Sequence, residues 1–552
     1  MSAKITTKFG HAVPPAPRHS VTVHMPGWQN VEKFAADSRS VITTFNNAYP
    51  RMKPHKDIVA LGSAVLKHLK ADNNEACLLF SSLQSARECL EYSISLRRDD
   101  GVSKTPVALE QIRIRAVIAK DLFFAVIFPR EKYLVVGGFW TIPGVGVSSR
   151  FAEINLEHLD QLNEVELSED SAPRLNFKTP DHELLRDRII QYLDRAPLTN
   201  QQLRPSIKDV YFFPTGMAAI YKTHSYLVNL HQSTTVLFGM AFMNTITAFE
   251  EFGPNFKLFG LGTDADLRDL EVFLQEEHSQ GRKVQAIWAE FPANPILVTP
   301  NITKLRALAT EYDTILIIDD TIAGFANVDI TYMTDIHISS LTKSFNGYAD
   351  VIAGSAVLNP ASPKYNDLKH LFDKHYVPEL YVADAKAIEQ NSRDYLPRTT
   401  KLNENASALV RYLHSCAQDP KSAVCNAYHP SINVSGGHYE QFMRPATAEF
   451  TSGYGCLLNV EFEDLPTTIA FYDNLNLHKG PHLGAPFTLA FAYTMSAYGT
   501  KLDWAAQYGL RPTQIRISAG LEDTATLLEE FKIAVEAADK VKMEAKVRNA
   551  KS

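Results

Sequence analysis

The sequence is poor in cysteine and has no excess of basic charge. Five of its 552 residues are cysteine and no two form a Cys-x-x-Cys pair, which argues against a zinc site or a disulfide framework and favours reduced thiols. The formal net charge is −7. Because phosphate backbones bind basic surfaces, this charge argues against nucleic acid as a main partner.

Long apolar runs are also missing. No stretch approaches the roughly 20 consecutive apolar residues of a membrane helix, and the first residues lack the apolar centre of a secretory signal. We therefore expect a cytoplasmic protein that has no membrane partner. There is no internal repeat and no Gly-x-Gly-x-x-Gly motif, and the glycine-containing stretch 137–146 is predicted to be a turn or hairpin.

Hydrophobic residues make up 45% of the chain, enough for a large core. Residues 1–56 contain several prolines and are predicted to be irregular. Two strand-like runs, 122–128 and 133–136, and an amphipathic helical pattern over 182–196 follow. They predict an additional α/β module over residues 57–204.

Short apolar runs then alternate with helical patterns. The runs 284–291 and 314–318 are typical of buried strands, and 267–274 and 302–311 have helical spacing. This alternation predicts a parallel sheet with helices on both faces. Polar groups at the carboxyl ends of such strands meet at a ligand crevice.

The last third is richer in helical patterns. Residues 381–417 predict long helices with a break at Pro397, 455–461 and 514–518 predict strands, and 523–545 predicts a closing helix. We therefore divide the chain into four parts: an arm (1–56), the module (57–204), a large domain (205–400) and a C-terminal α/β domain (401–552).

Lys343 lies in a hydroxyl-rich segment with Ser340 and Thr342, before Asn-Gly. Such hydroxyl and backbone N–H groups can bind phosphate, and a neighbouring lysine can form a Schiff base with an aldehyde cofactor. Asp319 ends an apolar run, where a buried carboxylate would keep the ring nitrogen of pyridoxal 5′-phosphate (PLP) protonated. A helix-capping Asp and an unrelated surface lysine explain this pair equally well.

Two more segments suit a phosphorylated cofactor. Gly216 and Met217 open a helical pattern, whose free N–H groups favour phosphate. Asn294, in Glu-Phe-Pro-Ala-Asn-Pro after a predicted strand, can donate to the phenolic oxygen of PLP. An ordinary helix start and an Asn-Pro turn are the alternative interpretations.

In this order the segments resemble the Cys/Met-metabolism family of fold-type I PLP enzymes, and most of all its fungal cystathionine γ-synthase branch. The family pattern of Gly-Met, Glu-x-Pro-x-Asn-Pro, Asp-Asn-Thr, Ser-x-Thr-Lys and Arg-x-Ser-x-Gly-x-Glu-Asp is matched at 216–217, 290–295, 319–321, 340–343 and 516–523. The resemblance implies the PLP-dependent transferase fold type I. This α/β fold has a mostly parallel seven-stranded sheet between helices and a smaller C-terminal α/β domain.

The resemblance also implies residue roles. Lys343 and Asp319 would be catalytic, Arg516 and Glu290 would bind substrate, and Gly216, Met217, Phe242, Asn294, Ser340 and Thr342 would hold PLP. Tyr49-Pro50-Arg51 resembles the Tyr-x-Arg motif that reaches the PLP phosphate of a neighbouring subunit. We therefore expect a homodimer or homotetramer in which Tyr49 and Arg51 act in trans.

Three positions depart from the family pattern. Phe242 replaces the tyrosine that stacks on PLP, so its ring can stack but has no hydroxyl group. His482 replaces the serine of Ser-Leu-Gly and would either bind substrate or only fill space. Asp320 replaces the Asn of Asp-Asn-Thr.

The expected function is γ-replacement on O-acetyl-L-homoserine, or another O-acylhomoserine, with L-cysteine to give cystathionine for methionine biosynthesis. One alternative is the same vinylglycine-type chemistry with sulfide or a carbon nucleophile in secondary metabolism. A cystathionine lyase and a non-catalytic PLP-binding protein are the others. In the enzymatic alternatives, small amino acids are the substrates, and no metal is expected.

Overall fold

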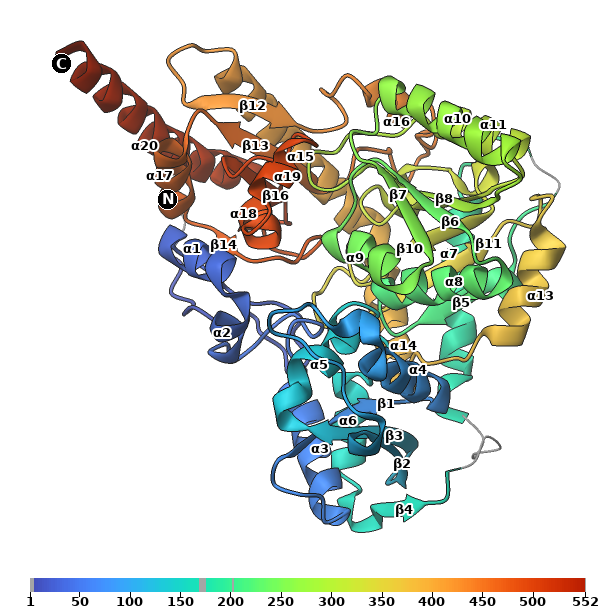
Figure 1. Cartoon of the computed structure of the whole chain (residues 1–552). Helices are drawn as coiled ribbons and strands as arrows, with labels where there is room; N and C mark the ends of the chain where they lie inside the picture. Colours follow the sequence, from blue (N-terminus) through green and yellow to red (C-terminus); the bar gives the residue numbers. More distant parts are fainter. Residues whose placement is uncertain (1–3, 168–174, 201–202, 552) are drawn as a thin grey trace.

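The computed structural model describes residues 4–167, 175–200 and 203–551, and in this part of the chain three β-sheets follow one another (Figure 1). They have four, seven and five strands. The described helices include none that is long and apolar enough to cross a membrane.

The first sheet is antiparallel, with the order β1-β3-β2-β4, and belongs to the predicted module. Its strands are β1 (Glu75–Phe80), β2 (Arg113–Ile118), β3 (Leu122–Pro129) and β4 (Asn163–Val165). Helices α3 (Lys56–His68), α4 (Leu83–Ile94), α5 (Tyr133–Thr141) and α6 (Ser149–Leu156) pack around it. The run 122–128 is a strand, as predicted.

The predictions for 133–136 and 137–146 were wrong at α5. The first run opens this helix, and the helix continues to Thr141 before the chain turns at Gly144. Periodicity failed because a short apolar run fits a buried strand and a buried helix equally well. Val135, Val136, Phe139 and Trp140 are all buried in the helix.

The seven-stranded sheet has the order β5-β11-β10-β9-β8-β6-β7. Its strands are β5 (Val210–Phe213), β6 (Thr234–Phe238), β7 (Asn255–Phe259), β8 (Val284–Glu290), β9 (Ile315–Asp319), β10 (Ile336–Ser339) and β11 (Gly354–Leu358). Only β11 runs against the other six. The expected mostly parallel fold is confirmed, and so are the predicted strands near 284–291 and 314–318.

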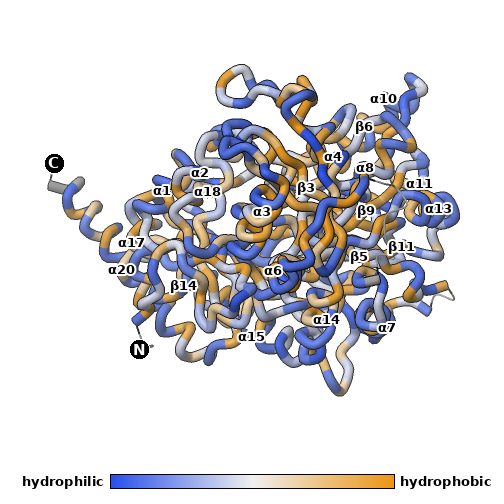
Figure 2. The backbone as a smooth tube through the Cα atoms, turned by 90° about the horizontal axis from the view of Figure 1, so that it is seen from below, coloured by the Kyte–Doolittle hydropathy of each residue, from blue (hydrophilic) through white to orange (hydrophobic). Residues whose placement is uncertain are grey.

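Helices cover both faces of this sheet, as predicted. Ile317 of β9 packs toward the core with α8 and α9, whereas Leu316 and Ile318 pack toward α10 and α11. The helices of this part are α7 (Pro180–Asp194), α8 (Gly216–Leu230), α9 (Met243–Phe252), α10 (Asp264–Ser279), α11 (Ile302–Glu311), α12 (Gly324–Asn327), α13 (Tyr365–His375) and α14 (Val382–Asn391). Figure 2 shows hydrophobic residues along the inner strands and a hydrophilic α13 on the outside.

The third sheet has the order β12-β13-β16-β15-β14. Its strands are β12 (Val424–Tyr428), β13 (Leu457–Phe462), β14 (His478–Lys479), β15 (Leu489–Phe491) and β16 (Gln514–Ser518). Its helices are α15 (Tyr395–Ala417), α16 (Gly436–Glu440), α17 (Leu465–Asn474), α18 (Tyr493–Tyr498), α19 (Leu502–Ala506) and α20 (Thr524–Lys551). The predicted strands and closing helix are present.

The predicted break at Pro397 lies a few residues earlier. A 3₁₀ turn over Ser392–Asp394 separates α14 from α15, and Pro397 sits in the first turn of α15. Proline is tolerated there because the first N–H groups of a helix have no partner within the helix. The arm also differs from the prediction, since it contains α1 (Trp28–Ala36) and α2 (Ser38–Thr43).

Candidate active site

A cavity of about 830 Å³ lies at the carboxyl ends of the strands of the large sheet. This volume is in the upper part of the range for small-molecule sites. The predicted residues on its wall are Tyr49, Arg51, Gly216, Met217, Phe242, Glu290, Asn294, Asp319, Ser340, Lys343 and Arg516. The fold thus brings most of the predicted site together from segments far apart in sequence.

Lys343 follows β10 in a tight loop, in which its backbone N–H donates to the Ser340 carbonyl (3.3 Å). Its Nζ lies 4.9 Å from the centre of the Tyr49 ring. Burial lowers the pKa of Lys343, and the positive charges of Arg51 and Arg516 lower it further. A lysine with a lowered pKa is suited to act as a nucleophile and as a base.

Asp319 ends β9, as predicted. Its Oδ1 accepts hydrogen bonds from the backbone N–H (2.9 Å) and the hydroxyl (2.5 Å) of Thr321. Burial raises the pKa of Asp319 to about 6. A buried carboxyl group on this wall is suited to share a proton with a ring nitrogen.

Glu290 stands opposite Asp319 in the register of strands β8 and β9. Its two carboxylate oxygens accept from the backbone N–H groups of Phe242 (2.7 Å) and Asn294 (3.2 Å). Burial, together with the nearby Asp319, raises the pKa of Glu290 to about 8. Through these bonds Glu290 positions two wall residues, and the expectation that it binds substrate stays a prediction.

Arg516 projects from β16 into the cavity. Its guanidinium donates to the side-chain oxygen of Asn294 (3.3 Å) and to the Pro481 carbonyl (2.6 Å), and it lies 4.8 Å from the ring centre of Tyr493. Burial lowers its pKa to about 10, so Arg516 stays charged at neutral pH. No carboxylate pairs with it among the described residues, which leaves this buried cation for an anionic ligand.

The start of α8 forms a close-packed anion cradle. Thr215 caps the helix by accepting from the Ala218 N–H (2.9 Å). A Cβ on Gly216 would lie only 2.7 Å from the side chain of Ser340, so only glycine fits at this position. The helix N-terminus, the Ser340 hydroxyl and the guanidinium of Arg51 on the same wall suit a phosphate group.

Two predicted residues are not on the wall. The Thr342 hydroxyl is bonded to the backbone of Ala353, and its predicted contact with the cofactor stays a prediction. His482 is 1% exposed and lies beside the Tyr49 ring, with 6.3 Å between ring centres, while its neighbours Pro481 and Leu483 line the cavity. Burial keeps the pKa of His482 well below its usual value, and neither ring nitrogen has a hydrogen-bond partner among the described residues. Its role, as a substrate contact or as a residue that fills space, stays a prediction.

Tyr49 and Arg51 lie on the cavity wall. The guanidinium carbon of Arg51 lies 5.4 Å from the Phe242 ring centre, and Arg51 donates to the Thr141 carbonyl (2.7 Å). The expectation that the two residues serve a neighbouring subunit stays a prediction.

The sequence analysis missed two parts of the wall. One is Tyr493, whose hydroxyl accepts from the Met243 N–H (3.2 Å) beside Phe242. The other is α5, which contributes Tyr133, Leu134 and Trp140. No motif marks these residues, because they reach the cavity only through long-range packing. Asp320 lies outside the cavity, with Oδ2 3.0 Å from His337 Nε2.

Comparisons with known proteins agree with this geometry. A model of the family described as "Cys/Met metabolism PLP-dependent enzyme" matches residues 201–536, and one described as "Fungal trans-sulfuration enzyme, N-terminal domain" matches residues 57–148. The fold resembles that of cystathionine gamma synthase from Xanthomonas oryzae, with a TM-score of 0.53, 18% identity and coverage of 68% of this chain and 92% of that one.

Several curated proteins are similar over nearly their whole length. "Alanine racemase ungC" of Aspergillus violaceofuscus is 32% identical, with 96% of each chain covered. "Cystathionine gamma-synthase-like enzyme iboG2" of Amanita muscaria is 31% identical, with 97% of each covered. "Cystathionine gamma-synthase" of Neurospora crassa is 29% identical over 96% of this chain and 98% of that one.

Proposed function

The chain belongs to the Cys/Met metabolism family of PLP-dependent enzymes, and we propose that it catalyses γ-replacement on an O-acylated L-homoserine. The observation that supports this most is the placement of Lys343, Asp319 and Arg516 on one cavity wall. With O-acetyl-L-homoserine and L-cysteine, the Cγ–O bond breaks and releases acetate. A C–S bond then forms at Cγ as the thiol loses its proton, which gives cystathionine.

The residues fit PLP in a definite orientation. Lys343 would bind its aldehyde carbon, Asp319 would keep a proton on its ring nitrogen, and Gly216, Ser340 and Arg51 would hold its phosphate. Phe242 would stack on the ring. When bound, PLP supplies an electron sink for negative charge at the substrate Cα.

The remaining steps belong to protein groups. Arg516 would bind the substrate α-carboxylate through two parallel hydrogen bonds and so fix the direction of the Cα–H bond. Lys343, whose pKa is lowered by burial, would accept the Cα proton and then exchange a proton at Cβ. Tyr49 would assist, because Lys343 Nζ lies 4.9 Å from the centre of its ring. Burial raises the pKa of Tyr49, but the positive charges of Lys343 and Arg51 lower it more, so that its net shift is downward.

The size of the cavity also indicates how large the nucleophile can be. Its wall continues from Phe242 along α9 to Glu251, about 13 Å at 1.5 Å per residue. Ile220, Leu134 and Met52 are apolar residues of the same wall, which also carries the charged side chains of Arg39, Lys53 and Glu251. A cavity of this size exceeds the need of cysteine and supports a bulkier nucleophile as a variant of the proposed reaction.

Amino-acid racemisation is the second candidate function. The similarity to a protein named alanine racemase supports it, and so does the position of the Tyr49 ring 4.9 Å from Lys343 Nζ. A racemase needs two groups that exchange a proton with Cα, and Lys343 and Tyr49 would supply them.

The test is to incubate the PLP-loaded protein with O-acetyl-L-homoserine, with and without L-cysteine, and separately with L-alanine. Cystathionine that forms only with both substrates, and is lost in Lys343→Ala but not in the surface control Lys304→Ala, would support γ-replacement. Formation of D-alanine from L-alanine by the wild type, and its loss in the Tyr49→Phe variant, would support racemisation instead. Acetate release without cystathionine would retain the elimination half-reaction and direct the search to larger nucleophiles, whereas the absence of every product would overturn both proposals.

A further inference from the structure

The loop of Lys343 ends in a strained turn. Arg398 of α15 holds the first half of the loop by donating to the carbonyls of Ser344 (2.8 Å) and Phe345 (3.1 Å). In the second half, Ala349 has a φ of 54°, in the left-handed region that residues with a Cβ rarely adopt. A backbone of this kind persists only where neighbouring groups fix it, so the second half of the loop needs a support of its own.

Asp350 closes the loop through a polar network. Its Oδ1 accepts from the side-chain amides of Asn346 (3.1 Å) and Asn391 (3.0 Å). Asn391 also donates to Asn346 Oδ1 (2.9 Å), and Asn346 is fully buried three residues after Lys343. The Asp350 carboxylate therefore fixes the residues that follow the lysine.

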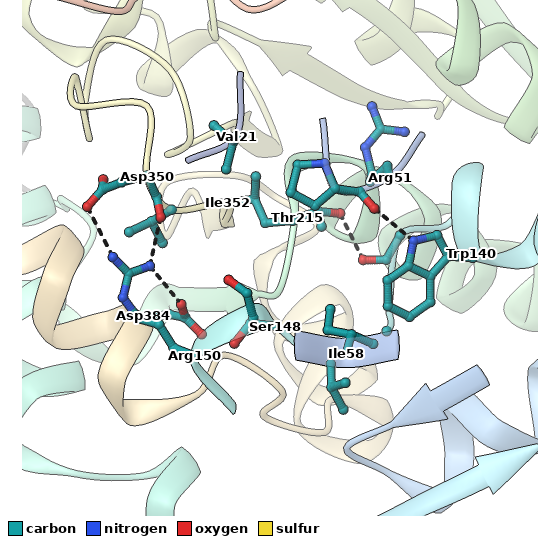
Figure 3. A pocket seen from close by; sticks show the side chains of 16 residues that line it. Val21, Arg51, Ile58, Trp140, Ser148, Arg150, Thr215, Asp350, Ile352 and Asp384 are labelled. Atoms are coloured by element: carbon teal, nitrogen blue, oxygen red, sulfur yellow. Dashed lines mark hydrogen bonds and ion pairs between the residues drawn. The ribbon is translucent and has the colours of Figure 1, made fainter. Parts of the chain in front are cut away.

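The module reaches the same carboxylate through one arginine. Arg150 is the second residue of α6, and its guanidinium donates to the backbone carbonyl (2.7 Å) and to Oδ2 (3.0 Å) of Asp350. Its Nη1 also lies 3.4 Å from Oδ1 of Asp384, a residue of α14 that is 2% exposed. Figure 3 shows Arg150 between these two aspartates. Because a buried carboxylate is costly without a cation, Asp384 keeps the guanidinium at the place from which it clamps Asp350.

From these contacts we propose that Arg150 is a positioning residue for Lys343. It acts through Asp350 and Asn346, and it gives the module a part in the active site although Arg150 is not on the wall of the large cavity. A guanidinium suits this task because its planar fork bonds to a carbonyl and a carboxylate at once. The inference rests on the proposed role of Lys343 and not on the identity of either substrate.

Hydrogen–deuterium exchange of the PLP-free full chain tests the clamp. In Arg150→Met, the peptide that spans residues 343–350 should exchange roughly tenfold faster than in the wild type, because its turn loses two hydrogen bonds from the module. Arg188→Met is the matched control, since Arg188 pairs with Glu389 of α14 (2.9 Å) instead of with Asp350. Unchanged exchange in Arg150→Met, or an equal increase in both variants, would overturn the proposal.

The reaction of Lys343 with PLP gives a readout that a merely structural contact would not change. The PLP-free protein is mixed with increasing PLP, and the absorbance of lysine-bound PLP is followed in time. Arg150→Met should slow the first-order step at saturating PLP roughly tenfold and leave the Kd of the initial complex unchanged, because only the lysine is displaced. Arg150→Lys should recover part of the rate, since it keeps the charge but not the fork. A weaker initial complex with a normal first-order step would contradict the positioning role.

If Arg150→Met does not fold, Asp350→Asn is the second variant. It keeps the size of the side chain and the backbone carbonyl that Arg150 binds, but it removes the charged partner. It should speed exchange of residues 343–350 and slow the first-order step, and normal values for both would overturn the proposal. Neither measurement uses an amino-acid substrate, so a failed γ-replacement assay does not affect them. If the wild type forms no lysine-bound PLP, the proposed role of Lys343 fails and the inference fails with it.

Discussion

Asp319 and Glu290 are acidic residues at one register position of neighbouring strands. Burial raises the pKa of both carboxyl groups, that of Asp319 from 3.8 to about 6. Burying a protonated carboxyl group costs less free energy than burying an ionised one. Without PLP, these two residues therefore stabilise the folded state more at low pH than at high pH. A protonated ring nitrogen beside Asp319 would remove this penalty.

We predict that Asp319→Asn changes the stability of the PLP-free protein in a pH-dependent way. Since the folded-state pKa is raised, the wild type is fully stabilised by this group below pH 3.8 and loses that contribution as the pH rises through about 6. The variant should therefore match the wild type near pH 4 and exceed it above pH 6, as measured by urea denaturation. An offset that stays constant across this range would contradict the prediction. Asp269→Asn, on the exposed side of α10, is the control.

Tyr493 supplies a hydroxyl group next to the site where the expected stacking tyrosine is replaced by Phe242. It accepts the Met243 N–H, and burial raises its pKa to about 12, so it is protonated at neutral pH. Its ring also packs on the guanidinium of Arg516. These contacts position the backbone beside Phe242 and the guanidinium of Arg516, the residues that we propose bind cofactor and substrate.

Tyr493→Phe should lower kcat/KM about fivefold, the equivalent of one lost hydrogen bond of about 1 kcal/mol. Steady-state kinetics with O-acetyl-L-homoserine would measure this. Tyr428→Phe is a matched control, because it removes a hydroxyl that donates to Glu461 on the third sheet, outside the cavity. A comparable loss of kcat/KM in both variants would show that the effect of Tyr493 is only structural.

At the scale of elements, α5 joins the module to the site. One end of the helix lines the cavity through Tyr133 and Leu134, and the other binds the arm through Trp140 and Thr141. Gly138 is required within it, because a Cβ there would lie 2.5 Å from the Tyr92 hydroxyl oxygen. The helix is thus packed closely enough to hold Arg51 in place.

Trp140→Phe should weaken PLP binding about fivefold, since it frees the Pro50 carbonyl and loosens the Tyr49–Arg51 segment at a cost of about 1 kcal/mol. Titration of the PLP-free protein with PLP would measure the Kd. Trp504→Phe, which alters a tryptophan packed between Tyr498 and Tyr508, should leave the Kd unchanged. Equal affinity in Trp140→Phe and the wild type would exclude the positioning role.

At the scale of the whole molecule, polar contacts dock the module on the large domain. Lys222 of α8 is 2% exposed and donates to Glu88 (2.7 Å) and Ser85 (3.0 Å) of α4. Ser82 and Ser85 also donate to the buried Glu379. Because these groups are buried, the loss of a partner would cost more free energy here than at the surface.

Lys222→Met should destabilise the protein by about 3 kcal/mol, because it leaves the Glu88 carboxylate without its cation. The double variant Lys222→Met/Glu88→Leu should recover most of this loss, and the midpoint of chemical denaturation would report both. Lys283→Met, which breaks the exposed pair with Asp313, should change stability by less than about 0.5 kcal/mol. An equally small effect of Lys222→Met would contradict the proposed docking contact.

The sequence by itself determined the family and the large sheet. Lys343, Asp319, Gly216 and Arg516 each belong to a short motif and lie together on the cavity wall, while their roles stay predictions. The strands of the large sheet were equally readable, since buried parallel strands are continuous apolar runs. Such signals depend on neighbours in the sequence.

Tertiary structure decided the rest. The helix at 133–141 depends on a choice that periodicity cannot make. The meeting of Tyr49 with Lys343 and the bond from Phe242 to Glu290 depend on segments far apart in the sequence. A local pattern fixes which groups a segment offers. Which of them meet in one cavity is set by the packing that buries the most apolar surface and satisfies the most buried polar groups.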